Sequence, residues 1–284
     1  GLFILVQVLV IVVARGGEHL LTSVMPRPTA VLTAALLAST MCVSMVVTGY
    51  RLIVRRIGRR EAPEMDGPGA LRELAAGLAL GGALICAVFA VLALAGAYRI
   101  TGVGWSEGIA VGLVFGVLGG FNEEMMFRGF LQRLIETRLG SWWALGTISV
   151  IFGLLHLSNP QATLSGCLII ALTAAPLLGA CYLLTRRLWL AIGVHAAWNF
   201  VQGGVFGSDV SGTGMIRRGL FEAAFHGPDW LTGGDMGVEG SVVTVVVCVM
   251  AAAVILLAAR RRGMLLPPRW RRPEPAGDDD GGRQ

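Results

Sequence analysis

The stretch Gly108–Phe127 reads GIAVGLVFGVLGGFNEEMMF, and it decides the kind of fold that this chain can adopt. Residues 108–121 carry only apolar side chains or none, and about 20 apolar residues suffice for a helix to cross the hydrocarbon core of a bilayer. Two adjacent carboxylates, Glu123 and Glu124, nevertheless lie near the end of this stretch, and an ionised group in hydrocarbon is costly. The stretch therefore predicts a membrane span that carries functional residues.

The composition of the whole chain agrees with this prediction. Of 284 residues, 55% are hydrophobic and only 14% are charged, whereas a soluble domain needs more charge on its surface. The apolar residues form long blocks, which predict an all-α polytopic transmembrane helix bundle of about eight spans. The spans are expected at residues 1–14, 29–50, 74–98, 108–127, 142–158, 164–184, 188–206 and 241–259.

The basic residues predict the orientation of this bundle. All 23 are arginine, and 18 of them lie in the segments after the second, fourth, sixth and eighth spans. Because cytoplasmic loops are enriched in basic residues, we expect both termini in the cytoplasm and the protein in the cell membrane. The arginines are spread over several loops rather than gathered in one patch, so the sequence does not indicate nucleic-acid binding.

Polar residues inside the spans come in pairs at helical spacing. Glu124 and Arg128 can form an ion pair on one face, since side chains four residues apart are neighbours on a helix. In the same way Phe152 can pack one turn from His156, and both His195 and Asn199 can face one cavity. The pairs therefore predict that several spans contribute to one buried polar site; helix-to-helix hydrogen bonding alone is the plainer alternative.

Glu123 has no countercharge one turn away and needs a partner from another helix. The expected turn at Leu139–Gly140 lies 16 residues from Glu123 on one side and 16 from His156 on the other. At about 1.5 Å per residue, both would stand roughly 24 Å from the turn of an antiparallel hairpin. His195 follows Arg187 by 8 residues, which is about 12 Å and leaves a mismatch in height. The sequence thus pairs Glu123 with His156 more firmly than with His195.

Three short motifs now stand in order along the chain: EEMMFR at 123–128, FGLLH at 152–156 and HAAWN at 195–199. This ordered set resembles the motifs of the CAAX-processing and bacteriocin-processing membrane proteases, which include the type II CAAX prenyl endopeptidases. The resemblance covers roughly residues 107–206, and no position of the three motifs departs from the pattern.

The resemblance implies a role for each motif residue. Glu123 would be the base that activates a water molecule, and His156 would hold the same water. His195 and Asn199 would stabilise the oxyanion, while Glu124 and Arg128 would form a supporting pair. Peptide hydrolysis needs such a base and such hydrogen-bond donors, so residues and resemblance agree.

Two readings of the water activation stay open. Glu123, His156 and His195 with one water would also form a catalytic zinc shell. No HExxH motif occurs, so the usual helix-borne zinc signature is absent. We favour a metal-free glutamate mechanism and expect no cofactor.

The resemblance implies an intramembrane endopeptidase that acts on a membrane-anchored or lipid-modified peptide in the bilayer. The alternatives are a non-catalytic membrane scaffold or immunity protein with the same fold, and a transporter with a proton relay. A transporter of that type predicts paired broken helices in two halves, and the sequence has no such symmetry.

The expected division of the chain follows from the spans and motifs. It comprises N-terminal transmembrane helices at 1–106, a catalytic core at 107–206, a flexible extracytoplasmic loop at 207–240, a last transmembrane helix at 241–266 and a disordered cytoplasmic tail at 267–284. Within the core, Gly112, Gly116 and Gly120 predict one helix face that packs closely against another helix.

Overall fold

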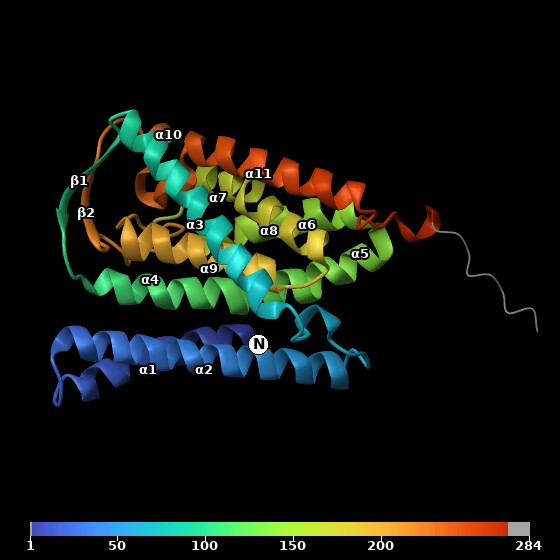
Figure 1. Ribbon diagram of the computed structural model, residues 1–284, viewed down its shortest axis with the longest axis horizontal. Coiled ribbons are helices and arrows are strands. Elements are labelled where there is room, and N and C mark those ends of the chain that lie inside the picture. The colour runs from blue at the N-terminus through green and yellow to red at the C-terminus, as the bar shows by residue number, and fades with distance from the viewer. Residues whose placement is uncertain (1, 272–284) are drawn as a thin grey trace, which may run out of the picture.

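The computed structural model describes the backbone of residues 2–271 and the side chains of residues 5–271. Most of the expected tail, residues 272–284, lies outside the described residues. The α-helices are α1 (Leu2–Leu21), α2 (Arg27–Arg56), α3 (Ala70–Leu94), α4 (Glu107–Val117), α5 (Arg133–Leu139), α6 (Ser141–Leu155), α7 (Leu164–Leu172), α8 (Ala174–Thr185), α9 (Trp189–Asn199), α10 (Asp229–Thr232) and α11 (Val242–Arg261). Three π-helical segments, Leu118–Glu123, Met125–Gln132 and Phe200–Val205, and five short 3-10 turns complete the helical structure (Figure 1).

The predicted membrane bundle is confirmed. Six helical runs of the described chain are long and apolar enough to cross a membrane: Arg27–Arg56, Ala70–Leu94, Glu107–Leu139, Ser141–Ser158, Leu164–Thr185 and Val242–Arg261. The first and seventh expected spans correspond to α1 and to α9 with its π-helical continuation, which are not among these six. The chain is therefore an integral membrane protein with an all-α polytopic architecture.

A two-stranded sheet closes one end of the bundle, opposite the end that carries α5 (Figure 1). Strand β1 (Tyr98–Val103) pairs antiparallel with β2 (Phe221–Phe225), with Tyr98 opposite Phe225. The sequence analysis expects no strand here. Both strands lie outside the membrane spans, and β1 reads YRITGV, with aromatic and β-branched residues that suit an extended backbone.

Glycines set the closest contacts between helices, because a side chain at these positions would collide with a neighbouring backbone. A Cβ at Gly81 of α3 would lie 2.3 Å from the carbonyl oxygen of Val194 in α9. A Cβ at Gly116 of α4 would lie 2.7 Å from the carbonyl oxygen of Ala196, also in α9. The packing role predicted for Gly116 is thus confirmed, and α9 is held tightly between α3 and α4.

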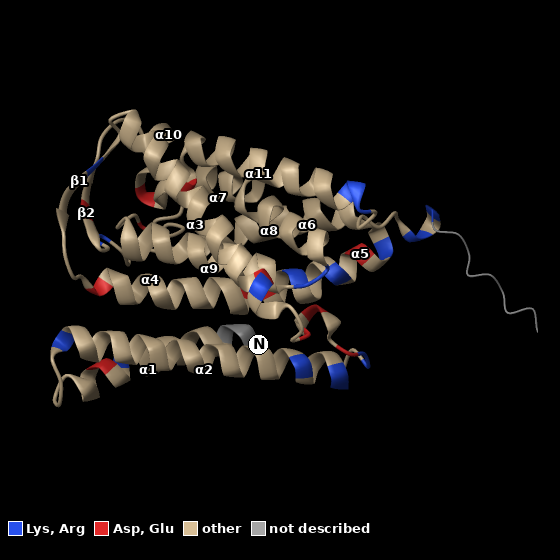
Figure 2. Ribbon diagram, viewed as in Figure 1, with Lys and Arg blue, Asp and Glu red and all other residues tan. Residues whose placement is uncertain are grey.

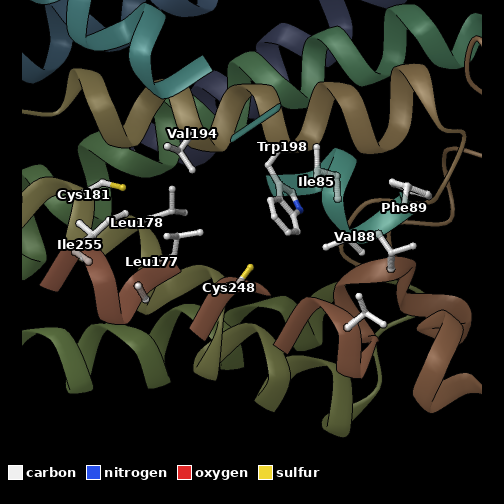
Figure 3. Packing of buried hydrophobic residues seen from close by; sticks show 14 of the residues in the cluster. Ile85, Val88, Phe89, Leu177, Leu178, Cys181, Val194, Trp198, Cys248 and Ile255 are labelled. Atoms are coloured by element: carbon white, nitrogen blue, oxygen red, sulfur yellow. The ribbon is translucent and has the colours of Figure 1, made fainter. Parts of the chain in front are cut away.

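An apolar core lies between α3, α8, α9 and α11 and covers one side of α9 (Figure 3). Phe89, Leu177, Trp198 and Cys248 belong to this cluster, and all four are buried. Trp198 lies three residues after His195 in α9, so the two side chains share one face of the helix. The core therefore fixes the rotation of α9 about its own axis.

Residues 207–240 are structured rather than the flexible loop that the sequence analysis expects. The segment contains β2, α10 and two 3-10 turns, Gly234–Met236 and Val238–Gly240. The carboxylate of Asp209 accepts hydrogen bonds from the backbone N–H groups of Gly214 and Ile216. These local bonds give a glycine-rich sequence a defined course across the end of the bundle.

Candidate active site

The two adjacent glutamates lie in the middle of the long run Glu107–Leu139, where the helix widens into π-helical turns. Glu123 ends the first π-helical segment, and Met125 begins the second. Such turns insert an extra residue and change the directions of the side chains, and they recur at functional sites. The local backbone therefore presents Glu123 and Glu124 differently from a regular α-helix.

Glu124 is the centre of a buried ionic group. Its Oε1 lies 2.8 Å from Nη1 of Arg128 and 2.8 Å from Nδ1 of His195. The side chains of Glu124 and Arg128 are both 0% exposed, so neither charge is compensated by water. The predicted Glu124–Arg128 pair is confirmed, and its bond to His195 joins the long helix to α9.

Arg128 is held from three sides. Besides Glu124, its Nη2 donates to the carbonyl oxygen of Ala175 at 2.9 Å. Its Cζ atom lies 4.8 Å from the centre of the Phe152 ring, within the range of a cation–π contact. The guanidinium thus connects the long helix, α6 and α8 around one charge, which fixes the position of Glu124.

His156 lies at the end of α6, where its ring faces the site. Its Nδ1 lies 2.7 Å from the carbonyl oxygen of Phe152, and its ring centroid lies 4.8 Å from that of the Phe152 ring. A carbonyl oxygen only accepts, so Nδ1 is the donor and the neutral ring keeps a lone pair on Nε2. The predicted Phe152–His156 packing is confirmed, and Nε2 is available to hold a water molecule.

The hairpin places Glu123 level with His156. The rings of Phe127 and Phe152 contact each other with centroids 4.9 Å apart, and the hairpin turns at Gly140 with a φ of 82° that glycine adopts readily. Moving one turn away from Gly140 along each helix leads from Phe127 to Glu123 and from Phe152 to His156. Glu123 is partly exposed and lies close enough to Arg128 and His195 to interact with both charges.

Asn199 and His195 both line one cavity, as their spacing predicts. Asn199 donates from Nδ2 to the carbonyl oxygen of Phe115 at 3.4 Å. A Cβ at Gly119 would lie 2.6 Å from Nδ2 of Asn199 and 2.7 Å from Nε2 of His195. The missing side chain at Gly119 therefore makes room for both polar groups, a requirement that the sequence analysis does not identify.

The cavity has a volume of about 20 Å³, room for about one water molecule, and is walled mainly by apolar side chains. Its polar lining comprises His156, His195, Asn199, Ser211 and Glu239. Glu123 is not among the lining residues, whereas two residues of the 207–240 segment are. These two residues are not predicted from the sequence, because Ser211 carries no charge and Glu239 stands outside the apolar spans, three residues before α11.

The residues proposed for a zinc shell do not fit a metal ion as they stand. Among residues 2–271, no three histidine, cysteine, aspartate or glutamate side chains converge closely enough to hold one. The Phe152 ring lies against both imidazoles, with its centroid 4.8 Å from that of His156 and 6.2 Å from that of His195. The arrangement of these side chains therefore favours a reaction that needs no metal.

Comparison with known families agrees with this geometry. Residues 104–201 match the family model described as "Type II CAAX prenyl endopeptidase Rce1-like". This segment is an Rce1-like domain. It contains all three motifs, and its limits differ by only a few residues from the 107–206 core that the sequence analysis expects, so the predicted resemblance is confirmed. The comparisons with curated proteins and with solved structures gave no match.

The Rce1-like domain also depends on a buried carboxylate that the sequence analysis overlooks. Glu64, in the short turn Pro63–Met65, is 0% exposed and accepts hydrogen bonds from Tyr50, Arg60 and Arg133. The hydroxyl group of Tyr50 also donates to the carbonyl oxygen of Gly129 at 3.2 Å. The loop before α3 thus braces the π-helical segment that follows Glu124.

Proposed function

We propose that this protein is an intramembrane endopeptidase that hydrolyses peptide bonds with a water molecule activated by Glu123 and His156. The observation that carries the proposal is the convergence of His156, His195 and Asn199 on one cavity of an Rce1-like domain, with Glu123 near enough to interact with His195. A buried ionic group holds the convergence in place. Rce1-like relatives are described as endopeptidases, which supports this class of reaction.

The chemistry follows from where the polar atoms lie. Glu123 would take a proton from the water while Nε2 of His156 orients it, and the resulting hydroxide would attack the carbonyl carbon. Asn199 Nδ2 and, in its imidazolium form, His195 Nε2 would donate to the developing oxyanion. A positioned base contributes typically 10²–10⁴-fold and one oxyanion donor roughly 10²–10³-fold to the rate.

Glu124 and Arg128 would act by positioning rather than by touching the substrate. The bond from Glu124 Oε1 to His195 Nδ1 fixes the ring so that Nε2 points towards Asn199 and Gly119. Arg128 neutralises Glu124, which leaves Glu123 as the basic carboxylate of the pair. This division of roles is the one that the motif resemblance implies.

The substrate class is a membrane-anchored or lipid-modified peptide, processed as in CAAX-type or bacteriocin-type maturation. The cavity lies within a membrane bundle and has mostly apolar walls, which suits a segment that reaches it from the bilayer. We further propose that the protein resides in the plasma membrane with both termini in the cytoplasm. Most of the arginines gather at the end of the bundle that carries α5 and the C-terminal ends of α2 and α11, in support of this orientation (Figure 2).

A reconstituted assay tests this function. Purified protein in lipid vesicles would be mixed with membrane-anchored peptides, with and without a C-terminal prenylated cysteine, and the products identified by mass spectrometry. Wild type should cut a subset of them, Glu123→Gln should cut none, and the control Glu18→Gln, which lies in α1 and does not line the cavity, should cut like wild type.

The same assay separates the alternatives. A zinc chelator should leave the wild-type rate unchanged if the mechanism is metal-free, and inactivation that added zinc reverses would support a zinc enzyme. Equal behaviour of wild type and Glu123→Gln, with both proteins folded, would favour a non-catalytic scaffold or immunity protein. Proton-coupled flux across the same vesicles would favour a transporter.

A further inference from the structure

Glu239 lies outside the Rce1-like domain yet contributes a carboxylate to its cavity. It belongs to the turn Val238–Gly240 and is 5% exposed. The titratable groups that line the cavity with it are His156 from the end of α6, His195 from α9 and Cys248 from α11. The segment 207–240 therefore forms a wall of the cavity rather than a distant loop.

Ser211 holds Glu239 in a defined orientation. Both the backbone N–H and the hydroxyl group of Ser211 donate to Oε2 of Glu239 at 2.7 Å. Both hydrogen bonds found for this carboxyl group within the described residues go to Oε2, so Oε1 remains for another partner. The two bonds from Ser211 thus hold Oε2 of Glu239, while Oε1 can bind a molecule in the cavity.

The backbone of Ser211, which makes the two bonds that clamp Glu239, is strained. Its φ is 54°, in the left-handed region that residues other than glycine seldom adopt. Its carbonyl oxygen accepts from Nδ2 of Asn159, three residues after His156, at 2.7 Å. Non-glycine residues in this region cluster at functional sites, where the surroundings hold them in place. Through its strained backbone, Ser211 thus connects Glu239 with the segment that follows His156.

The cavity also contains a buried donor with no partner. Nε1 of Trp198 makes no hydrogen bond within the described residues, although Trp198 lines the cavity. A buried polar group without a partner is costly, and it points to a bound molecule that supplies one. A peptide group provides both an acceptor for Nε1 of Trp198 and a partner for Oε1 of Glu239.

We propose that Glu239 is a further catalytic residue of the proposed endopeptidase, the general acid that protonates the leaving nitrogen of the scissile peptide bond. When the C–N bond breaks, its electron pair goes to nitrogen, and the proton of the Glu239 carboxyl group joins it to give the amine. Glu239 then regains, through exchange with water, the proton that Glu123 took from the nucleophile. This assignment rests on the proposed function.

The environment of Glu239 suits an acid. Burial raises the pKa of Glu239 above its ordinary value and prevails over the hydrogen bonds from Ser211 and the neighbouring histidines, which lower it. A carboxyl group that stays protonated nearer neutral pH can deliver a proton where a surface glutamate cannot. The raised pKa supports the assignment that the geometry makes.

The leaving group provides the test. Two vesicle-bound reporter peptides share the sequence around a cut made by the wild type, one with the scissile amide and one with an ester in its place. An alkoxide leaves far more readily than an amine anion, so the ester depends less on an acid. Glu239→Gln keeps the shape and can still accept from Ser211; it should lose about 10²–10⁴-fold in kcat/KM on the amide and less than about tenfold on the ester.

The controls separate this assignment from the proposed function. Glu222→Gln, an exposed glutamate of the same segment, should cut both reporters like wild type, and Glu123→Gln should lose both. Ser211→Ala, which loosens the clamp, should lower the amide rate more than the ester rate. Equal losses on both reporters in Glu239→Gln would overturn the general-acid role while leaving the endopeptidase intact. A wild type that cuts no peptide would overturn both.

Discussion

At the scale of single residues, the site depends on one carboxylate that binds Arg128 and His195, and the histidine is a second cation when it is protonated. Glu124 binds Arg128 and His195 through the same oxygen, Oε1, while its other oxygen, Oε2, is buried and makes no hydrogen bond within residues 5–271. Such an arrangement leaves little tolerance for change, because the loss of either cation leaves a buried charge with less compensation.

Arg128→Met should therefore destabilise the protein strongly. It leaves Glu124 buried with only His195 beside it, and breaking a buried pair in this way costs about 3–5 kcal/mol. Arg55→Met breaks the exposed pair with Glu61, which should cost no more than about 1 kcal/mol. Unfolding of the purified variants in detergent measures both changes, and similar stabilities would contradict the central place given to Glu124.

Gly119→Ala should reduce activity without unfolding the protein. Its Cβ would approach Asn199 Nδ2 and His195 Nε2 to within 2.7 Å, so both proposed oxyanion donors must shift. Displacing one such donor costs roughly 10²–10³-fold in kcat. Gly146→Ala in α6, where a Cβ meets nothing within 4 Å, is the matched control and should retain full activity. Peptide cleavage by folded protein measures the difference.

At the scale of elements, α9 is the part that the fold positions most tightly. It carries His195 and Asn199 between α3 and α4, and glycines on both neighbours allow their backbones to approach it. The rotation and depth of α9 thus decide whether its two polar residues reach the cavity.

Two consecutive glycines of α3 test this point. Gly81→Ala would place a Cβ 2.3 Å from the carbonyl oxygen of Val194, next to His195, whereas the Cβ of Gly82→Ala would meet no atom of the described residues within 4 Å. Gly81→Ala should cost about 1–3 kcal/mol through overpacking and lower the cleavage rate. Gly82→Ala should be neutral or slightly stabilising, because alanine is the better helix former. Unfolding and cleavage assays on the pair would refute the packing account if the two variants behaved alike.

The elements also show what the sequence could and could not predict. Spacing within one helix predicted Glu124–Arg128, Phe152–His156 and the shared cavity of His195 and Asn199, because side chains four residues apart share a face. Contacts between elements depend on tertiary packing that no local pattern encodes. The bond between Glu124 and His195 closes the mismatch in height that straight-helix counting leaves open.

Buried carboxylates outside the apolar runs were missed for a related reason. Glu64 and Glu239 stand in polar sequence that reads as loop, and only the folded chain shows that each is enclosed. A clue was present for Glu239, since it directly precedes the start of the last helix. The strands β1 and β2 were missed because each is short and pairs across more than 100 residues.

At the scale of the whole molecule, the absence of lysine from the sequence offers a direct test of orientation. Arg56→Lys and Arg99→Lys each place a single exposed lysine, near the arginine-rich end and in β1 respectively. A membrane-impermeant amine reagent should label Arg99→Lys in intact cells and Arg56→Lys only after permeabilisation, with the parent chain as background. The reverse pattern would place both termini outside the cytoplasm.

The central claim is that Glu123 activates water to cut peptides inside the membrane. The most direct test compares the peptide termini in membrane fractions from cells that express wild type or Glu123→Gln at matched levels. New termini should appear only with the wild type, and their sequences would identify the substrate and the cleavage site. Identical sets of termini from two folded and equally abundant proteins would contradict the claim.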